Sequence, residues 1–392
     1  MLQQSRANSY DTYAKMREDR PVLAVGGSHS RVWYVTGYDA ARQILGNHKQ
    51  FVKDYRNTLP ERERKQLPPE PELYELLNYN MLGVDAPDHT RLRAIVSKAF
   101  TNRRIMALEP RIQEIADELI ADFPASGEID LIDAYAFPLP IIVICELLGI
   151  PASDRDQFRV WSNSFVEGSA NYASEMMAFF WYIARMVSER RDAPQNDLIS
   201  ALIQAEENGA KLSEQEIYSM IALLIVAGHE TTVGLISNAM LALLQHPAQM
   251  ERLRQSPDLT VAAIEEFLRY DNPVEQASPR YAAEDVEIDG QLIQRGEMVM
   301  VVVGAANRDP HQFDDPNTLQ TEQSDHKHPG HLGFGYGVHY CLGAPLARLE
   351  GRIAINTLLQ QYPNMELALP VSELQYRNSP IVRGLLHLPV QI

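Results

Sequence analysis

The sequence predicts a predominantly α-helical protein with a small amount of β-structure. The strongest observation is an apolar helical pattern over residues 214–245, which opens at the capping box Ser213–Glu216. Further helical periodicity covers residues 105–148 and 154–191. The β-structure is limited to short apolar runs, near the N-terminus and within residues 281–303.

Composition and charge narrow the possible functions. The chain has 392 residues, 45% of them hydrophobic, which allows two or three average domains or one large domain. Its two cysteines, Cys145 and Cys341, exclude a disulfide framework and a multi-cysteine zinc or iron–sulfur site built by this chain alone. A net charge of −17 argues against general nucleic-acid binding. Residues 1–20 are polar, so we expect a cytoplasmic protein without a membrane anchor.

The N-terminal part of the chain predicts a hairpin, a loop and a helix. The hairpin is expected over residues 21–37, around a glycine-rich turn. Residues 53–71 are rich in charge and proline, which predicts a mobile loop. The helix is expected over residues 88–100, and it places His89 and Arg93 on one face, four residues apart. By periodicity alone, such a cationic face is usually solvated surface.

The helical pattern continues with interruptions that mark its ends. Gly127 and the run Pro138–Pro140 break the pattern of residues 105–148, and Cys145 lies in an apolar stretch typical of a core. Residues 166–173 contain small and polar residues, which suggests a flexible connection between two helices over a pocket.

The centre of the long helical pattern reads Ala227-Gly-His-Glu-Thr-Thr232. A helix of roughly 30 residues is about 45 Å long and must cross the middle of the protein. Small residues such as Ala227 and Gly228 allow a flat group to approach the backbone. Glu230 and Thr231 place an acid and a hydroxyl in apolar surroundings, which costs free energy unless they are paired. The alternative is a glycine needed for packing and a threonine bonded to a preceding carbonyl.

The last third of the chain predicts a helix, short strands and a final hairpin. The helix over residues 261–270 contains Glu266 and Arg269, whose spacing alone is a weak signal. The strands and the hairpin are expected over residues 281–283, 286–288, 298–303 and 376–388.

Residues 331–348 form the most informative stretch. Three glycines at alternate positions precede Cys341, and Gly343 and Pro345 mark the start of a helix. A helix N-terminus favours a thiolate, so Cys341 is a candidate metal ligand or nucleophile, although a lone cysteine is more often a structural thiol. A dinucleotide-binding loop does not fit, because the glycine spacing is wrong and no long hydrophobic strand precedes it.

The string Phe334-Gly-x-Gly-x-His339-x-Cys341-Leu-Gly343 resembles the haem-binding loop of the cytochrome P-450 family. In that family the cysteine is the proximal haem ligand. Four further signatures of the family occur in the right order along the chain: His89 with Arg93, Ala227 to Thr232, Glu266 with Arg269, and Arg280.

The resemblance implies the cytochrome P-450 fold, which is mostly α with a small β-rich region and a long central helix over a buried haem. It implies one domain over residues 1–392, with the haem-binding loop at about 331–348 and the oxygen-activation helix at about 214–245. It also implies the residue roles. Cys341 is the axial ligand of the haem iron; Thr231 and Glu230 deliver protons; Glu266 and Arg269 are structural; and cofactor contacts come from His89, Arg93, Ala227, Gly228, Arg280, Phe334, His339 and Gly343. Glu230 stands where many members of the family have aspartate.

The implied activity is that of a haem-thiolate monooxygenase. It inserts one oxygen atom from O₂ into a C–H or C=C bond of a small hydrophobic molecule, with haem b as cofactor and a role expected in secondary metabolism. Electrons are expected from a ferredoxin or flavodoxin with its NAD(P)H-dependent reductase, and a local basic patch is expected from Arg103, Arg104, Arg348 and Arg352. Two alternatives remain: a haem-binding sensor or carrier, and a peroxide-using or isomerising enzyme on the same fold. The pattern leaves the substrate open.

Overall fold

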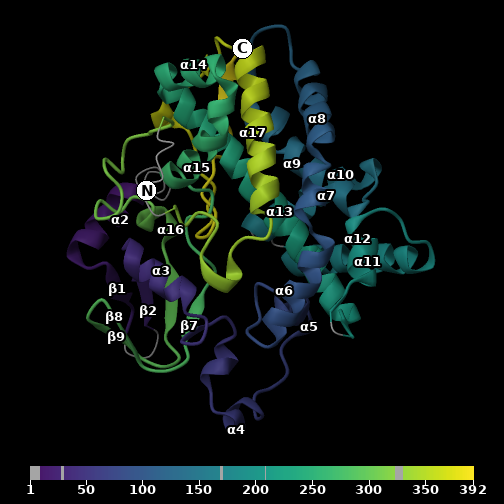
Figure 1. Cartoon of the computed structure of the whole chain (residues 1–392), viewed down its shortest axis with the longest axis vertical. Coiled ribbons are helices and arrows are strands. Elements are labelled where there is room, and N and C mark those ends of the chain that lie inside the picture. Colours follow the sequence, from purple (N-terminus) through teal and green to yellow (C-terminus); the bar gives the residue numbers. More distant parts are fainter. Residues whose placement is uncertain (1–8, 28–30, 168–170, 208, 323–329) are drawn as a thin grey trace.

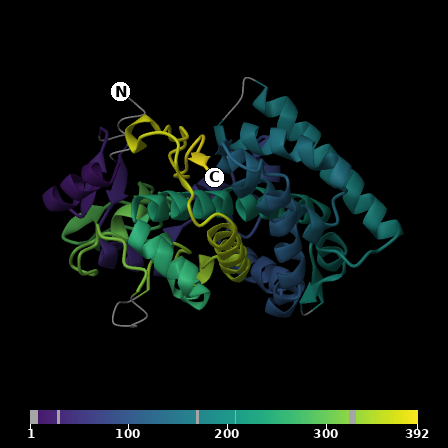
Figure 2. The ribbon, with the colours of Figure 1, turned by 90° about the horizontal axis from the view of Figure 1, so that it is seen from above.

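The computed structural model describes residues 9–27, 31–167, 171–207, 209–322 and 330–392. Figure 1 shows the main sheet at one side of the molecule and most of the helices at the other, and Figure 2 shows the same division from above. The longer α-helices are α2 (Ser9–Asp19), α3 (Tyr38–Gly46), α6 (Asp88–Ala99), α8 (Glu109–Ala121), α9 (Pro138–Leu148), α10 (Arg155–Glu167), α11 (Tyr172–Asp192), α13 (Glu214–Gln245), α14 (Pro247–Gln255), α15 (Thr260–Tyr270) and α17 (Ala344–Gln361).

Shorter helical segments connect these elements. The α-helical ones are α4 (Glu61–Arg64), α5 (Glu72–Asn78), α7 (Asn102–Met106), α12 (Leu198–Gln204) and α16 (Val303–Ala306). The remaining turns are η1 (Tyr55–Thr58), the π-helical η2 (Ile132–Ala136), η3 (Ala152–Asp154), η4 (Pro257–Leu259), η5 (Gly337–His339) and η6 (Val371–Glu373).

The largest sheet has five strands in the order β1-β2-β10-β7-β3. Within it, β2 and β10 are parallel and the other neighbours are antiparallel. A second sheet has the order β11-β12-β4, and two hairpins complete the β-structure. The strands are β1 (Val22–Val25), β2 (Val32–Val35), β3 (Phe51–Val52), β4 (Glu128–Asp130), β5 (Glu206–Glu207), β6 (Ala210–Lys211), β7 (Arg280–Ala282), β8 (Val286–Ile288), β9 (Gln291–Ile293), β10 (Met298–Val301), β11 (Glu366–Leu367) and β12 (Pro389–Gln391).

The helical core is built around α13. The hydroxyl of Ser213 accepts from the backbone N–H of Glu216, whose carboxylate accepts from the N–H of Ser213, so the predicted capping box is present. The helix ends before Pro247, and α9, α11, α15 and α17 all pack against it. Among the described residues, α13 is long and apolar enough to span a membrane, but 72% of its apolar window is buried inside the protein. It is therefore the core helix that the sequence predicts.

Most of the predicted elements are confirmed, with local differences. The N-terminal hairpin is present as β1 and β2, although residues 28–30 of its turn lie outside the described residues, as do residues 168–170 of the connection expected between α10 and α11. The mobile loop expected over residues 53–71 contains two short helical turns, η1 and α4. The last predicted strand stops at Val301, where α16 takes over.

The chain after α15 is anchored by one ion pair. Arg269 binds Glu266 through two hydrogen bonds of 2.7 Å each, and both side chains are almost completely buried. The same guanidinium donates to the carbonyl oxygens of Pro316 at 2.8 Å and Thr318 at 2.9 Å. The structural role expected for this pair is confirmed, because it ties α15 to the irregular segment that leads toward Cys341.

We expect Arg269→Leu to destabilise the protein strongly. The change leaves Glu266 buried without its cation and removes the donor from two carbonyl groups, and breaking a buried pair in this way typically costs about 3–5 kcal/mol. The measurement is thermal unfolding of the cofactor-loaded protein. Arg254→Leu is the matched control, because Arg254 and Glu251 form the same three-residue-spaced pair on an exposed surface. Similar losses for the two variants would show that burial does not matter here.

Candidate functional site

The segment before Cys341 folds into a tight loop that depends on its glycines. Gly335 and Gly337 have φ angles of +74° and +77°, which L-residues rarely adopt. A Cβ on Gly337 would also lie 2.8 Å from the carbonyl oxygen of Leu45, so α3 packs directly on this turn. The loop closes where the backbone N–H of Cys341 donates to the carbonyl oxygen of Phe334 at 2.9 Å. The backbone therefore fixes the position of the cysteine.

An ion-pair network supports the loop from outside. Arg348 of α17 binds Glu265 of α15 through two hydrogen bonds of 2.7 and 2.8 Å, and its guanidinium lies 4.5 Å from the ring centre of Phe334. The Nε2 atom of His331 lies 3.2 Å from the same carboxylate. Burial alone would raise the pKa of Glu265, but Arg348 and His331 lower it to about 2. Glu265 is therefore a fixed negative charge that joins two helices to the cysteine loop.

The Cys341 side chain is exposed to solvent. The protein atoms near its sulfur nevertheless desolvate the charged form and raise its pKa, whereas hydrogen bonding from the backbone N–H groups of Gly343 and Ala344, with the charge of Arg93, lowers the pKa in part. The predicted preference for a thiolate at this helix start is thus present as a contribution but is outweighed by desolvation. A group that holds a thiolate here must add positive charge, as a metal ion does. Gly343 itself has φ −80° and ψ 0°, which any residue can adopt.

A cluster of basic side chains lies beside this loop. The rings of His89 and His339 have their centres 4.3 Å apart, and Nη2 of Arg93 donates to the carbonyl oxygen of Tyr340 at 2.7 Å. Burial and the neighbouring Arg280 lower the pKa of His339 to about 2. Burial also lowers the pKa of Arg280 to about 10, with Asp85 opposing the shift. The structure therefore brings together all four predicted propionate ligands.

The unpaired atoms of this cluster indicate what it binds. In the described part of the chain, Nε2 of His89 and both Nε and Nη1 of Arg280 are buried without a hydrogen-bond partner. Buried donors of this kind require acceptors, and buried cations require anions. The two propionate carboxylates of a haem supply both, so these residues fit the cofactor that the sequence implies.

One face of α13 stays accessible within the otherwise buried helix. Ala227 is exposed and Thr231, one turn later, is partly exposed, and the Thr231 hydroxyl donates to the carbonyl oxygen of Ala227 at 3.0 Å. At Gly228 a Cβ would lie 3.3 Å from Ile144 of α9, so helix packing also favours a glycine at this position. Ala227 and Thr231 form the open face.

Glu230 does not share that face. One of its carboxylate oxygens lies 3.1 Å from Nη1 of Arg377, and the other lies 3.2 Å from Nε2 of His229. Glu230 is only 3% exposed, and Arg377 comes from the C-terminal hairpin, which is marked by the bridge between Tyr376 and Leu385. The predicted acid is therefore held in a buried ion pair.

Sequence reasoning missed two residues near this site. Lys53 lies close enough to His339 to lower the pKa of that histidine, and Arg280 in turn lowers the pKa of Lys53. The sequence around Lys53 predicted only a charged loop. Arg377 lies 147 residues from Glu230 along the chain. Neither residue belongs to a recognisable sequence motif. Each contacts its partner only because the fold brings distant segments together.

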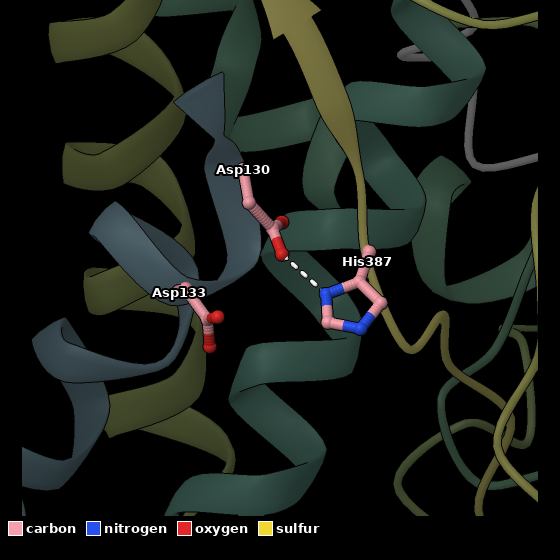
Figure 3. Close-up of side chains that lie close together, drawn as sticks. All are labelled: Asp130, Asp133 and His387. Atoms are coloured by element: carbon pink, nitrogen blue, oxygen red, sulfur yellow. Dashed lines mark hydrogen bonds and ion pairs between the residues drawn. The ribbon is translucent and has the colours of Figure 1, made fainter. Parts of the chain in front are cut away.

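A second group of potential metal ligands is explained by pairing. Figure 3 shows Asp130, Asp133 and His387, whose ligand atoms lie within 4.8 Å of one another. Nδ1 of His387 lies 2.5 Å from Asp130, and Asp133 forms an ion pair with Arg159. The other oxygen of Asp130 accepts from the backbone N–H of Leu388 at 3.0 Å. These contacts join the C-terminal strand to β4 and account for the cluster without an ion.

Comparisons with known proteins agree with this geometry. The family model for Cytochrome P450 matches residues 158–367. The vitamin D(3) 25-hydroxylase of Pseudonocardia autotrophica is 44% identical, with 98% of this chain and 93% of that protein covered. The polyketide biosynthesis cytochrome P-450 PksS of Bacillus subtilis is 41% identical over 98% of this chain and 96% of its own length.

Solved structures show the same relationship. The structure of PksS superposes with a TM-score of 0.90 at 40% identity and covers 99% of this chain and 97% of PksS. The P-450 named BioI, solved with hexadec-9Z-enoic acid ligated to acyl carrier protein, has a TM-score of 0.88 at 37% identity and covers 99% of both chains. With a cysteine loop, a basic cluster suited to propionates and relatives of this identity along its whole length, the chain belongs to the cytochrome P-450 family and is a haem-dependent monooxygenase.

Proposed function

We propose that the 392 residues act as one domain that hydroxylates or epoxidises a small hydrophobic molecule, with Cys341 as the axial ligand of the haem iron. The observation that carries the proposal is the Cys341 thiol, held by a glycine loop and by N–H donors beside a basic cluster. When bound, the haem supplies the activation of O₂ and the transfer of one oxygen atom. The relatives named for polyketide biosynthesis and vitamin D(3) hydroxylation support a large apolar substrate. We place this activity in the cytoplasm, in secondary metabolism.

The chain's own residues divide the remaining work. His89, Arg93, Arg280 and His339 bind the propionates, with the two arginines supplying positive charge, and Phe334 and the loop hold the sulfur in place. Thr231 offers a hydroxyl on the accessible face of α13, where it can hold a proton or a water molecule near the reacting oxygen. A sensor or carrier has no use for such a hydroxyl, and this favours the oxygen-activating enzyme over the other two functions. Glu230 holds negative charge behind that face.

We infer that electrons come from a separate ferredoxin or flavodoxin. A cavity of about 340 Å³ is lined by the cysteine loop together with Tyr38, Arg42 and Arg348, and three apolar or aromatic side chains of the loop are exposed: Tyr336, Val338 and Tyr340. Arg348 and Arg352 are engaged by Glu265 and Glu109, so their charges are largely compensated. Arg103 and Arg104 on α7 therefore carry most of the expected basic patch.

The axial ligand can be tested by spectroscopy. Cys341→His should abolish the strongly red-shifted carbon monoxide band that ferrous haem-thiolate proteins show, because the thiolate is replaced by an imidazole. Cys145→Ala is the matched control: Cys145 is completely buried in the helical core, and its loss should leave the band in place. Retention of the band in Cys341→His would contradict the assignment.

Thr231 should control how efficiently electrons lead to product. Removing one positioned proton-transfer group typically slows the assisted step by ~10² to 10⁴. Thr231→Ala should still bind haem and substrate and consume reduced nicotinamide, but release hydrogen peroxide in place of most product. The measurement is product formed per nicotinamide oxidised, with peroxide assayed in parallel. Thr231→Ser keeps the hydroxyl and should restore coupling; equal coupling in wild type and Thr231→Ala would make the hydroxyl structural.

The basic patch can be tested by reduction kinetics. Arg103→Gln with Arg104→Gln should slow association with an acidic ferredoxin and flatten its salt dependence, because rim charges act mainly on the association rate. Arg62→Gln with Arg64→Gln is the control, since it removes two positive charges from α4, a helix with no buried residue. If the two double variants are equally slow, net charge alone explains the effect and the patch on α7 is disproved.

A further inference from the structure

Lys53 follows β3, and its partly buried side chain reaches the segment before β7. Its ammonium nitrogen donates to the hydroxyl of Ser278 at 2.5 Å and to the carbonyl oxygen of Pro279 at 2.8 Å. These two residues immediately precede Arg280, the first residue of β7, which pairs with β3. A lysine ammonium has three protons. Two of them are used in these bonds, and one is left for a further acceptor.

Most of the ionisable groups around Lys53 are basic. Burial and the charge of Arg280 together lower the pKa of Lys53 to about 7, and Asp85 opposes the shift. Lys53 in turn lowers the pKa of His339, together with Arg280, His89 and Arg93. The cluster therefore collects side chains from the end of β3, from α6, from β7 and from the cysteine loop.

Asp85 compensates only part of this charge. One of its oxygens accepts from the backbone N–H of Lys53 at 2.8 Å. The other accepts from the backbone N–H of Asp54 at 3.1 Å and from the side-chain amide of Asn57 at 2.8 Å. With both oxygens engaged by neutral donors, this carboxylate fixes the loop. The basic side chains beside it (Lys53, His89, Arg93, Arg280 and His339) therefore remain available to bind a dianion.

We propose that Lys53 is a fifth cofactor-binding residue of this protein: its ammonium group donates its remaining hydrogen bond to a haem propionate while it holds Ser278 and Pro279 in place. The assignment rests on the proposed function, because it needs the haem. It also gives Lys53 a positioning role, since the segment that it fixes delivers Arg280 to the same propionates. The signature positions of the sequence do not include this lysine.

The proposal makes the charge of Lys53 measurable at the iron. A cation near the haem stabilises the ferrous state relative to the ferric state, because reduction adds an electron. Removing that cation should therefore make the reduction potential more negative. A charge-assisted hydrogen bond lost from the propionate should also speed haem loss, by roughly tenfold to a hundredfold.

The experiment compares Lys53→Met and Lys53→Gln with the wild-type holoprotein. Lys53→Met removes the charge and the hydrogen bonds, whereas Lys53→Gln keeps an N–H donor for Ser278 or Pro279 and removes only the charge. Readouts are haem transfer to an excess of a haem-scavenging apoprotein, the reduction potential, and the propionate bending mode in the resonance Raman spectrum. Lys49→Met is the matched control, because Lys49 is an exposed lysine on the same segment. We expect both Lys53 variants to show a lower potential and a shifted propionate mode, and Lys49→Met to show neither.

Three outcomes would decide against the proposal. Wild-type potential and propionate mode in Lys53→Gln would overturn it, even where Lys53→Met does not fold. Faster haem loss without any change in potential or propionate mode would show a purely structural lysine. Equal shifts in Lys49→Met would show a general charge effect. Failure of the proposed function is distinct from all three, because the wild-type protein itself would then lack the haem-thiolate spectrum.

Discussion

A cluster of basic side chains that is desolvated at one site is the constraint on which this structure depends. His89, Arg93, Arg280 and His339 converge from a helix, a strand and a loop, and burial penalises the charged form of each. Isolated buried cations cost several kcal/mol unless anions and hydrogen-bond acceptors compensate them. The site is therefore suited to a dianionic cofactor. Because the cofactor binds the folded protein, folding and cofactor binding are thermodynamically linked.

The cysteine loop faces the opposite problem, because it must present a sulfur without moving. Glycines let the backbone turn sharply but add no packing of their own. The loop is made rigid by two consecutive acidic residues of α15, which form ion pairs with different partners. Glu265 holds Arg348 and His331 against the loop, and Glu266 holds Arg269 under the segment that leads to it. One helix thus fixes both the approach to the loop and the loop itself.

The sequence predicts best what local chemistry determines. The bounds of α13 follow from a capping box and from Pro247, and the turn before Cys341 follows from glycines that tolerate positive φ. Position in a family motif located His89 and Arg280, and the fold brings them together. Lys53 and Arg377 could not be predicted, because their partners lie 225 and 147 residues away and no local pattern encodes such pairs. The packing role of Gly228 could not be predicted either, because only the folded structure shows that a Cβ there would meet Ile144.

The contrast between Glu230 and Thr231 shows how neighbouring residues of one motif enter different environments. Successive residues of an α-helix point about 100° apart, so both side chains cannot face the same space. Thr231 shares the accessible face with Ala227, whereas Glu230 points toward the C-terminal hairpin and Arg377. Losing either partner of a buried ion pair is costly, because the other charge is left uncompensated. The acid of the motif therefore depends on the C-terminal hairpin, since its partner Arg377 comes from the far end of the chain.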